Sequence, residues 1–194
     1  DRVPMFAKPG LVETLMRAAA KGESSEIKSQ GLRALVNLTA AAENQVRVFA
    51  TPGLVETLMR AGDTGETSDI KRMGVMALGN LSVAADNAVP MFSKPGLVEV
   101  LMRAGDKGET SEIKWWGLGA LANLSVADDN AVLMVAKPGL VEVLMRAGDK
   151  GETSEVKWHG LRALVNLAIV PGSAVPMFAT PGLVEMLMRV ADNG

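Results

Sequence analysis

The sequence predicts an all-α protein that is built from tandem repeats of three helices each. The tripeptide PGL recurs at Pro9, Pro52, Pro95, Pro138 and Pro181, so that successive copies lie 43 residues apart. A fixed period of this length is typical of an array in which each unit buries its apolar face against its neighbours. The composition fits such an array, because 48% of the residues are hydrophobic and only four are Phe.

The first two helices of a unit are predicted from their capping residues. A short helix is expected over residues 86–94, DNAVPMFSK, where Asp86 or Asn87 accepts the free N–H groups of the first turn. A second helix is expected over residues 95–105, PGLVEVLMRAG, with Pro at its start and Gly after its end.

The third helix is predicted over residues 110–126, with Thr110 or Ser111 as its cap. Its apolar positions follow a helical spacing of i, i+4, i+7, i+8 and i+11, at Ile113, Gly117, Ala120, Leu121 and Leu124. A Gly inside a helix costs about 1 kcal/mol relative to Ala. Because Gly117 recurs in every complete unit, we expect a neighbouring helix to approach its backbone closely.

The repeat resembles the armadillo repeat over essentially the whole chain. The segments ALVN-L, ALGN-L and ALAN-L are similar to the most recognisable stretch of that family, and PGLVE-LMR is similar to its second helix. The resemblance implies a right-handed armadillo-type solenoid whose third helices line a concave groove, and armadillo grooves bind extended peptides through an Asn. HEAT repeats are the alternative, but their two helices leave the short VPMF segment unexplained.

The organisation that follows is one armadillo-repeat domain over residues 1–194. Its parts are a leading first helix at 1–8, complete units at 9–51, 52–94, 95–137 and 138–180, and a partial unit at 181–194. Because the chain begins at Asp1 rather than Met, we expect a fragment or a processed form. The high sequence similarity between the units is explained by recent duplication or by consensus engineering. Uneven changes, such as IVPGSA (169–174) against VADDNA (126–131), favour a natural sequence.

Three positions of the third helix change strongly between units, and a fourth is always Asn. They hold Ser29, Gln30, Arg33 and Asn37, then Arg72, Met73, Met76 and Asn80, then Trp115, Trp116, Gly119 and Asn123, then Trp158, His159, Arg162 and Asn166. At 100° per residue, Glu112, Trp116 and Gly119 lie within about 40° of Asn123 around the helix axis. Residues that pack must look alike in every unit, whereas residues that face a partner can differ. We therefore predict one groove along the third helices.

The predicted peptide-binding residues combine the variable positions, the Asn ladder and two first-turn acids. They are Gln30, Arg33, Asn37, Arg72, Met73, Met76, Asn80, Glu112, Trp115, Trp116, Asn123, Glu155, Trp158, His159, Arg162 and Asn166. An Asn amide offers both a donor and an acceptor to an extended peptide backbone. With helices roughly 8–10 Å apart and about 3.3 Å per peptide residue, four Asn hold on the order of eight residues. Alternatively, the Asn residues only tie neighbouring helices together.

The tryptophans are expected to form an aromatic wall in the groove, with an open pocket beside Gly119 and with Arg162 stacked on Trp158. Packing of Trp115 and Trp158 between units is the alternative. Nuclear-import adaptors of the family have Trp four residues before the Asn, where this chain has Arg33, Met76, Gly119 and Arg162. Specificity for a basic import signal therefore does not carry over. The acids, such as Glu112, attract a basic partner or serve only the first turn of their helices.

The sequence lacks the residues that nucleic-acid binding, membrane insertion, metal binding or catalysis would need. The net charge of −2 disfavours a nucleic-acid partner, and no apolar run reaches the length of a membrane span. With no Cys and a single His, His159, we expect neither a metal site nor catalysis nor a cofactor. The absence of Cys fits an intracellular location. The sequence therefore predicts a module that binds a protein or an extended peptide. The alternative is a structural scaffold that associates end to end through an uncovered C-terminal unit.

Overall fold

The computed structural model describes residues 8 and 10–192, and every regular element in this part of the chain is an α-helix. The helices are α2 (Leu11–Lys21), α3 (Ser25–Thr39), α4 (Ala42–Phe49), α5 (Leu54–Thr64), α6 (Ser68–Leu81), α7 (Ala85–Phe92), α8 (Leu97–Lys107), α9 (Ser111–Leu124), α10 (Asp128–Val135), α11 (Leu140–Lys150), α12 (Ser154–Ala168), α13 (Pro171–Phe178) and α14 (Leu183–Asp192). The predicted all-α fold of three-helix repeats is confirmed. The leading helix expected at residues 1–8 falls outside the described residues, apart from Lys8.

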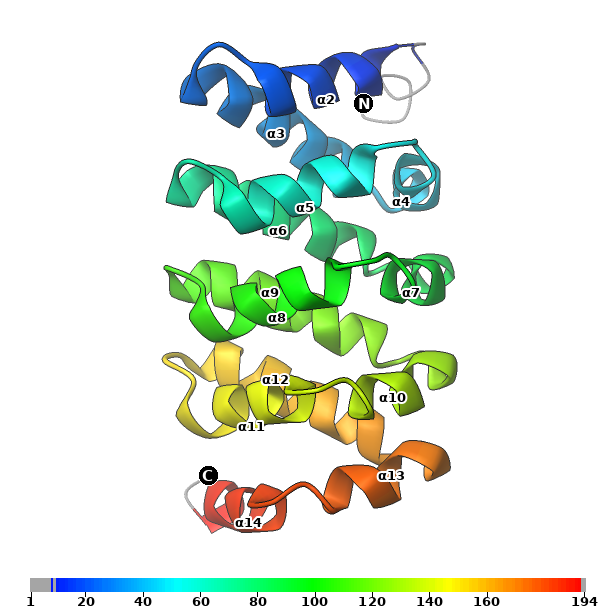
Figure 1. Cartoon of the computed structure of the whole chain (residues 1–194), viewed down its shortest axis with the longest axis vertical. Coiled ribbons are helices and arrows are strands. Elements are labelled where there is room, and N and C mark those ends of the chain that lie inside the picture. The colour runs from blue at the N-terminus through cyan, green and yellow to red at the C-terminus, as the bar shows by residue number, and fades with distance from the viewer. Residues whose placement is uncertain (1–7, 9, 193–194) are drawn as a thin grey trace. The chain divides into compact units, whose positions relative to one another are not determined.

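The helices belong to two compact units, one up to Met91 and one from Phe92 onward. In the first unit, α3 packs on α2, α6 packs on α5, and the third helices α3 and α6 lie side by side (Figure 1). The second unit repeats this arrangement, since α9 packs on α8, α12 packs on α11, and α9 lies beside α12 (Figure 1). Each unit therefore brings two of the predicted variable faces together.

The second helices begin two residues later than the sequence predicts. Gly96, not Pro95, precedes the first helical residue, and its φ of +79° lies in the left-handed region that Gly enters without a steric penalty. The helix also continues past Gly105 and ends at Lys107. Gly105 lies inside the helix, and Gly117 of α9 crosses it closely, because a Cβ added to Gly117 would lie 2.8 Å from the Gly105 backbone nitrogen. The close approach predicted for Gly117 is confirmed.

The third helices start at the predicted caps. The hydroxyl of Thr110 accepts a hydrogen bond of 3.2 Å from the backbone N–H of Ile113, and Ser24, Thr67 and Thr153 do the same in their repeats. Such a cap satisfies one of the free N–H groups that every helix leaves in its first turn. Local sequence chemistry therefore fixes where the third helix begins.

The first helices differ from the prediction in the role of Asn87. This residue does not cap α7; it is buried, and its side-chain amide donates to the backbone carbonyl of Leu81 (2.9 Å) at the end of α6. Asn130 makes the equivalent bond to Leu124, and Ser173 makes it to Leu167. The side chain thus satisfies a carbonyl that the preceding helix leaves open at its C-terminus.

No single helix of the described residues is long and apolar enough to cross a membrane. Two bent pairs, α9 with α10 and α12 with α13, reach that length and composition when taken together, each with a bend of 119°.

Candidate peptide-binding surface

The third-helix surface is defined here, unit by unit, as the accessible side chains of α3 and α6 and those of α9 and α12. The predicted residues that are exposed on it are Gln30, Arg33, Asn37, Glu112, Glu155 and Trp158. The half-buried ones are Arg72, Met76, Trp115, Trp116, Asn123, Arg162 and Asn166. The buried ones are Met73, Asn80 and His159. Met73 and His159 hold variable positions and Asn80 belongs to the Asn ladder, and contrary to the prediction that these residues contact a peptide, their side chains are not accessible to a partner.

The Asn ladder is connected to neighbouring helices. In the first unit, the side-chain amide of Asn80 on α6 donates to the backbone carbonyl of Val36 (3.3 Å) and to the hydroxyl of Thr39 (3.2 Å) on α3. The Thr39 hydroxyl in turn donates to the Val36 carbonyl (2.9 Å). The network fastens the C-terminal turn of one third helix to the C-terminal turn of the next.

The second unit contains the same network in equivalent positions. Asn166 on α12 donates to the carbonyl of Ala122 (3.1 Å) and to the hydroxyl of Ser125 (3.0 Å) on α9. The two acceptors of Asn166 lie on the same side of its amide nitrogen, because the Ser125 hydroxyl is itself bonded to the Ala122 carbonyl at 2.8 Å, and the same holds at Asn80. The amide nitrogen of both residues therefore serves the neighbouring third helix, and Asn80 is buried as well, so neither amide is free in this structure for two-sided pairing with a peptide backbone. The bonds of Asn80 and Asn166 therefore fit the alternative interpretation, in which the Asn residues connect neighbouring helices.

The hydroxyl partners of this network were not predicted from the sequence. The sequence does contain a signal for them, because the residue two positions after the Asn is Thr39, Ser82 and Ser125 in the first three repeats. In the fourth repeat this position is Ala168, and no further third helix packs on it among the described residues. This position therefore holds a hydroxyl residue in each repeat that is followed by another described third helix.

Four aromatic rings form a row across α9 and α12. Trp116 and Trp115 meet edge to face with ring centroids 4.4 Å apart, and Trp115 lies 5.4 Å from the His159 ring. His159 then contacts Trp158 at 4.8 Å, again edge to face. This arrangement matches the preferred geometry of aromatic pairs. The predicted aromatic wall thus contains the imidazole of His159 as its buried link.

Gly119 provides the space for that link. A Cβ added at Gly119 would lie 3.2 Å from Cε1 of His159, which is tighter than ordinary van der Waals contact. The open pocket expected beside Gly119 is therefore filled by the imidazole of the next repeat. This is a correction to the sequence prediction, because the side chain that fills the space is forty residues away.

The charges beside the aromatic row have defined partners. The guanidinium carbon of Arg162 lies 5.2 Å from the centroid of the Trp158 ring, so the predicted stacking of this pair is present. Burial lowers the pKa of His159 from 6.5 to about 4, and the positive charge of Arg162 acts in the same direction. The imidazole is therefore neutral at pH 7. Its buried Nδ1 has no hydrogen-bond partner among residues 8 and 10–192.

The third-helix surface of the first unit is ionic instead of aromatic. Asp69 accepts a hydrogen bond from Arg72 (2.6 Å) and one from the hydroxyl of Ser29 (2.9 Å). The hydrogen bond from Arg72 lowers the pKa of the Asp69 carboxyl. The charge of Arg72 is thus partly neutralised by its ion pair with Asp69. Arg33 on α3 is exposed to solvent.

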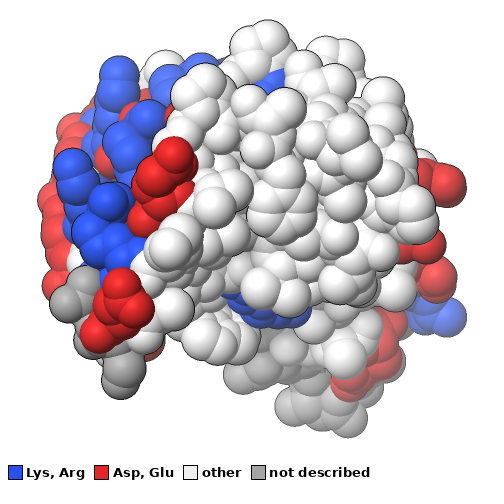
Figure 2. Space-filling view, turned by 90° about the horizontal axis from the view of Figure 1, so that it is seen from below, with Lys and Arg blue, Asp and Glu red and all other residues white. Residues whose placement is uncertain are grey.

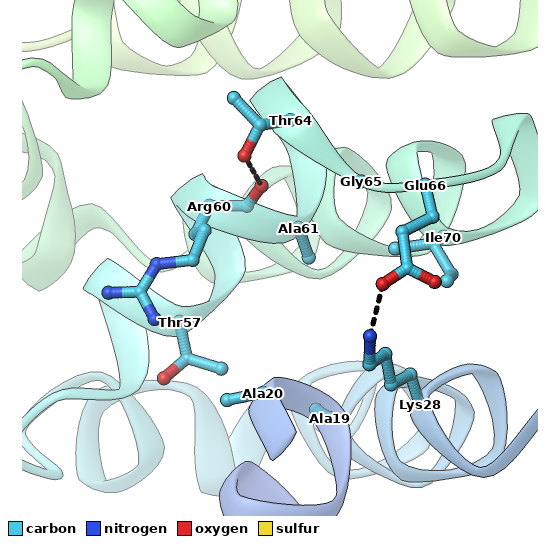
Figure 3. A pocket seen from close by; sticks show the side chains of 10 residues that line it. All are labelled: Ala19, Ala20, Lys28, Thr57, Arg60, Ala61, Thr64, Gly65, Glu66 and Ile70. Atoms are coloured by element: carbon cyan, nitrogen blue, oxygen red, sulfur yellow. Dashed lines mark hydrogen bonds and ion pairs between the residues drawn. The ribbon is translucent and has the colours of Figure 1, made fainter. Parts of the chain in front are cut away.

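The small cavities of the two units lie away from these residues. One of about 110 Å³ in the first unit is lined by Ala61, Lys28 and Glu66, whose charged groups point toward one another and form an ion pair (Figure 3). The hydrogen bond from Lys28 lowers the pKa of Glu66. The second unit has an equivalent cavity, of about 170 Å³, with the ion pair between Lys114 and Glu152. Because the cavity recurs with the repeat, it is a feature of helix packing.

The comparisons with known proteins agree with the fold. A crystal structure of an engineered protein is 28% identical, with a TM-score of 0.78 over 92% of this chain and 70% of that one. Another engineered protein is 30% identical, with a TM-score of 0.80 over 93% of this chain and 43% of that one. Computationally designed armadillo repeat proteins for modular peptide recognition match at 16% identity, with a TM-score of 0.76 over 98% of this chain and 84% of theirs.

The chain has the armadillo repeat fold. No protein-family model matches it, and no curated protein does. In its repeats, the variable residues lie on the third helices, and Asn80 and Asn166 connect those helices within each unit. Within the described part of the chain, no group of three or more His, Cys, Asp or Glu side chains is placed to hold a metal ion.

Proposed function

We propose that this armadillo-type protein binds an extended peptide segment of a partner protein on its third-helix surface, chiefly at the aromatic row of the second unit. The observation that carries the proposal is Trp158, a large apolar side chain that is 56% exposed and stacked by Arg162. Exposed Trp and Arg side chains dominate the binding energy of many interfaces. Among the similar structures, one is of armadillo repeats designed for modular peptide recognition, which supports this function class.

The peptide contacts would be made by side chains and not by the full Asn ladder. Trp115, Trp116 and Trp158 offer ring faces, while Asn166 retains its amide oxygen to accept a peptide N–H. With third helices roughly 8–10 Å apart and about 3.3 Å per extended residue, α9 and α12 together span roughly four to six peptide residues. Specificity would then come from the apolar or aromatic side chains of that segment.

The test is a selection of random peptides on the intact chain, followed by titration of the selected peptide. We expect Trp158→Ala to weaken binding by about thirtyfold, the range of an interface hot spot. Phe178→Ala is the matched control, because Phe178 is a 47% exposed aromatic residue on the first helix α13. Equal losses in both variants, or a selection that enriches no motif, would contradict the proposal.

A structural scaffold that associates end to end is the second candidate function. It is favoured by α14, where Val184 is 46% exposed and Met188 is 64% exposed, while the equivalent Val141 of α11 is 3% exposed. Sedimentation velocity at increasing concentration separates the two candidates. Association that Met188→Asp abolishes supports the scaffold, whereas a monomer that binds the selected peptide supports recognition.

A further inference from the structure

We propose that the first unit binds a carboxylate of another molecule through Arg60, in the small cavity between α2 and α5. This site is separate from the third-helix surface, because most of the residues that line the cavity belong to α2, to α5 and to the turn after α5. The bound carboxylate would take the place that the side chain of Asp106 has in the second unit.

The first argument is an arginine that recurs at the same place in every second helix and is paired in the second unit. Arg146 of α11 donates through Nε to the carboxylate of Asp106 on α8 at 2.8 Å. Arg189 of α14 donates to both carboxylate oxygens of Asp149 on α11, at 3.2 Å and 2.8 Å. At the left edge of Figure 2, Lys and Arg side chains likewise lie against Asp and Glu side chains. An arginine at this position is therefore placed to hold a carboxylate from the preceding repeat.

The second argument is that the first unit has no acid at the corresponding position. Arg60 of α5 is equivalent to Arg146, but the residue forty positions before it is Ala20 and not Asp. The guanidinium of Arg60 has no hydrogen-bond or ion-pair partner among the residues that the structure describes. This arginine is thus open to a carboxylate from outside the chain.

The other charged residues of the cavity are already paired with each other. Glu66 forms an ion pair with Lys28 and also accepts a hydrogen bond of 2.7 Å from the hydroxyl of Ser25. Figure 3 shows this ion pair at one end of the cavity and the guanidinium of Arg60 at the other. Helix packing produces the cavity in both units, but the arginine on its wall is held by an Asp of the preceding repeat in the second unit alone.

The cavity has room for the ligand and does not lie at an end of the array. Its volume is about 110 Å³, and a cavity needs roughly 10–15 Å³ to hold one water molecule. Several water-sized groups fit, as many as a carboxylate and its methylene group contain. Further repeats would not close the cavity, because the equivalent one between α8 and α11 persists at about 170 Å³ although α14 packs on α11.

The test is a titration of the ¹⁵N-labelled protein with N-acetyl-aspartate amide at constant ionic strength, followed through the Nε–H signals of the arginines. We expect a saturable shift of the Arg60 signal in the millimolar range. The Arg146 signal should not shift, because Asp106 already holds that side chain. N-acetyl-asparagine amide is the matched probe without the charge and should leave Arg60 unchanged. Arg17 is the control residue, since it is exposed at the same repeat position, and its signal should not saturate.

Two variants exchange the properties of the two units. Ala20→Asp supplies a carboxylate within the chain and should weaken the response of Arg60 by at least about tenfold. Asp106→Ala removes the carboxylate of the second unit and should make the Arg146 signal respond to the probe. Thermal unfolding checks that both variants remain folded. Because the two substitutions lie in different units, each variant tests the proposal without the other.

Titrations with acetate and with inorganic phosphate identify the source of the ligand. Tighter binding of the aspartate probe than of acetate assigns the site to an acidic side chain of a protein, and equal binding assigns it to a free organic acid. Phosphate that binds more tightly than either carboxylate would overturn the proposal. So would an Arg60 signal without a saturable shift, an equal response of Arg17 or to the asparagine probe, or an unchanged response in Ala20→Asp. Peptide recognition is tested separately with Trp158→Ala, so these results leave it unaffected.

Discussion

The side-chain amide of Asn166 on α12 donates to the backbone carbonyl of Ala122 on α9 at 3.1 Å, and Asn80 bonds in the same way to Val36. Both carbonyls lie near the C-terminus of their helix and also accept from a hydroxyl of their own repeat, that of Ser125 and that of Thr39. The Asn of the next repeat adds a donor from outside the helix. The invariant Asn is therefore part of the interface between successive third helices within each unit.

Asn166→Ala should destabilise the protein by about 1–2 kcal/mol, because the interface loses the hydrogen bonds that this amide donates to the Ala122 carbonyl and the Ser125 hydroxyl. The measurement is urea unfolding followed by circular dichroism. Asn37→Ala is the control at the same repeat position, where the side chain is exposed, and it should change the free energy of unfolding by less than about 0.5 kcal/mol. Equal losses in the two variants would refute the interface role.

Gly119→Ala and Gly160→Ala should differ in cost because different atoms meet the new methyl group. At Gly160 the Cβ would lie 2.7 Å from the Gly148 backbone nitrogen, which cannot move aside, so we expect a loss of about 2–3 kcal/mol. At Gly119 the three nearest atoms all belong to the His159 side chain, and we expect about 1 kcal/mol. Thermal unfolding measures both. In a His159→Ala background the cost of Gly119→Ala should vanish, and its persistence there would show that the imidazole is not the obstacle.

His159 should make stability depend on pH between about 6.5 and 4. Its pKa in the folded protein is about 4, so on acidification the unfolded chain takes up a proton first, near pH 6.5. The free energy of unfolding is therefore unaffected by this group above that range and falls through it, by at most about 3 kcal/mol. His159→Gln removes this contribution while the carboxylates stay the same. Wild type and variant unfolded in urea at pH 7 and pH 4.5 should thus differ in slope, and parallel losses would contradict the assignment.

Trp115→Ala should mainly lower the stability of the protein, whereas Trp158→Ala should mainly lower its affinity for the peptide. Trp115 is half-buried between Trp116 and His159, so its loss should cost about 2 kcal/mol. Trp158 is 56% exposed, and its loss should cost less than about 1 kcal/mol while weakening peptide binding. Paired measurements of melting temperature and peptide affinity check both. A larger stability loss at Trp158 than at Trp115 would indicate that Trp158 serves the core instead.

The sequence predicts features that depend on local chemistry or on the repeat itself. The cap at Thr110 and the close approach at Gly117 are of this kind, since each is encoded within one unit and repeated in the next. The predicted site is less complete. Trp158 and His159 are adjacent and both variable, yet one is exposed and the other buried. Only the packing of α12 against α9 distinguishes them, because a rotation of 100° turns one side chain toward the neighbouring helix.

The direct test of peptide recognition is a titration of the selected extended peptide into ¹⁵N-labelled protein, observed through the indole N–H signals of the three tryptophans. The Trp158 signal should shift most, the Trp115 and Trp116 signals should shift with it, and in Trp158→Ala these remaining shifts should need about thirtyfold more peptide. A peptide that binds while all three indole signals stay in place would contradict it, because the ligand would then occupy a different surface.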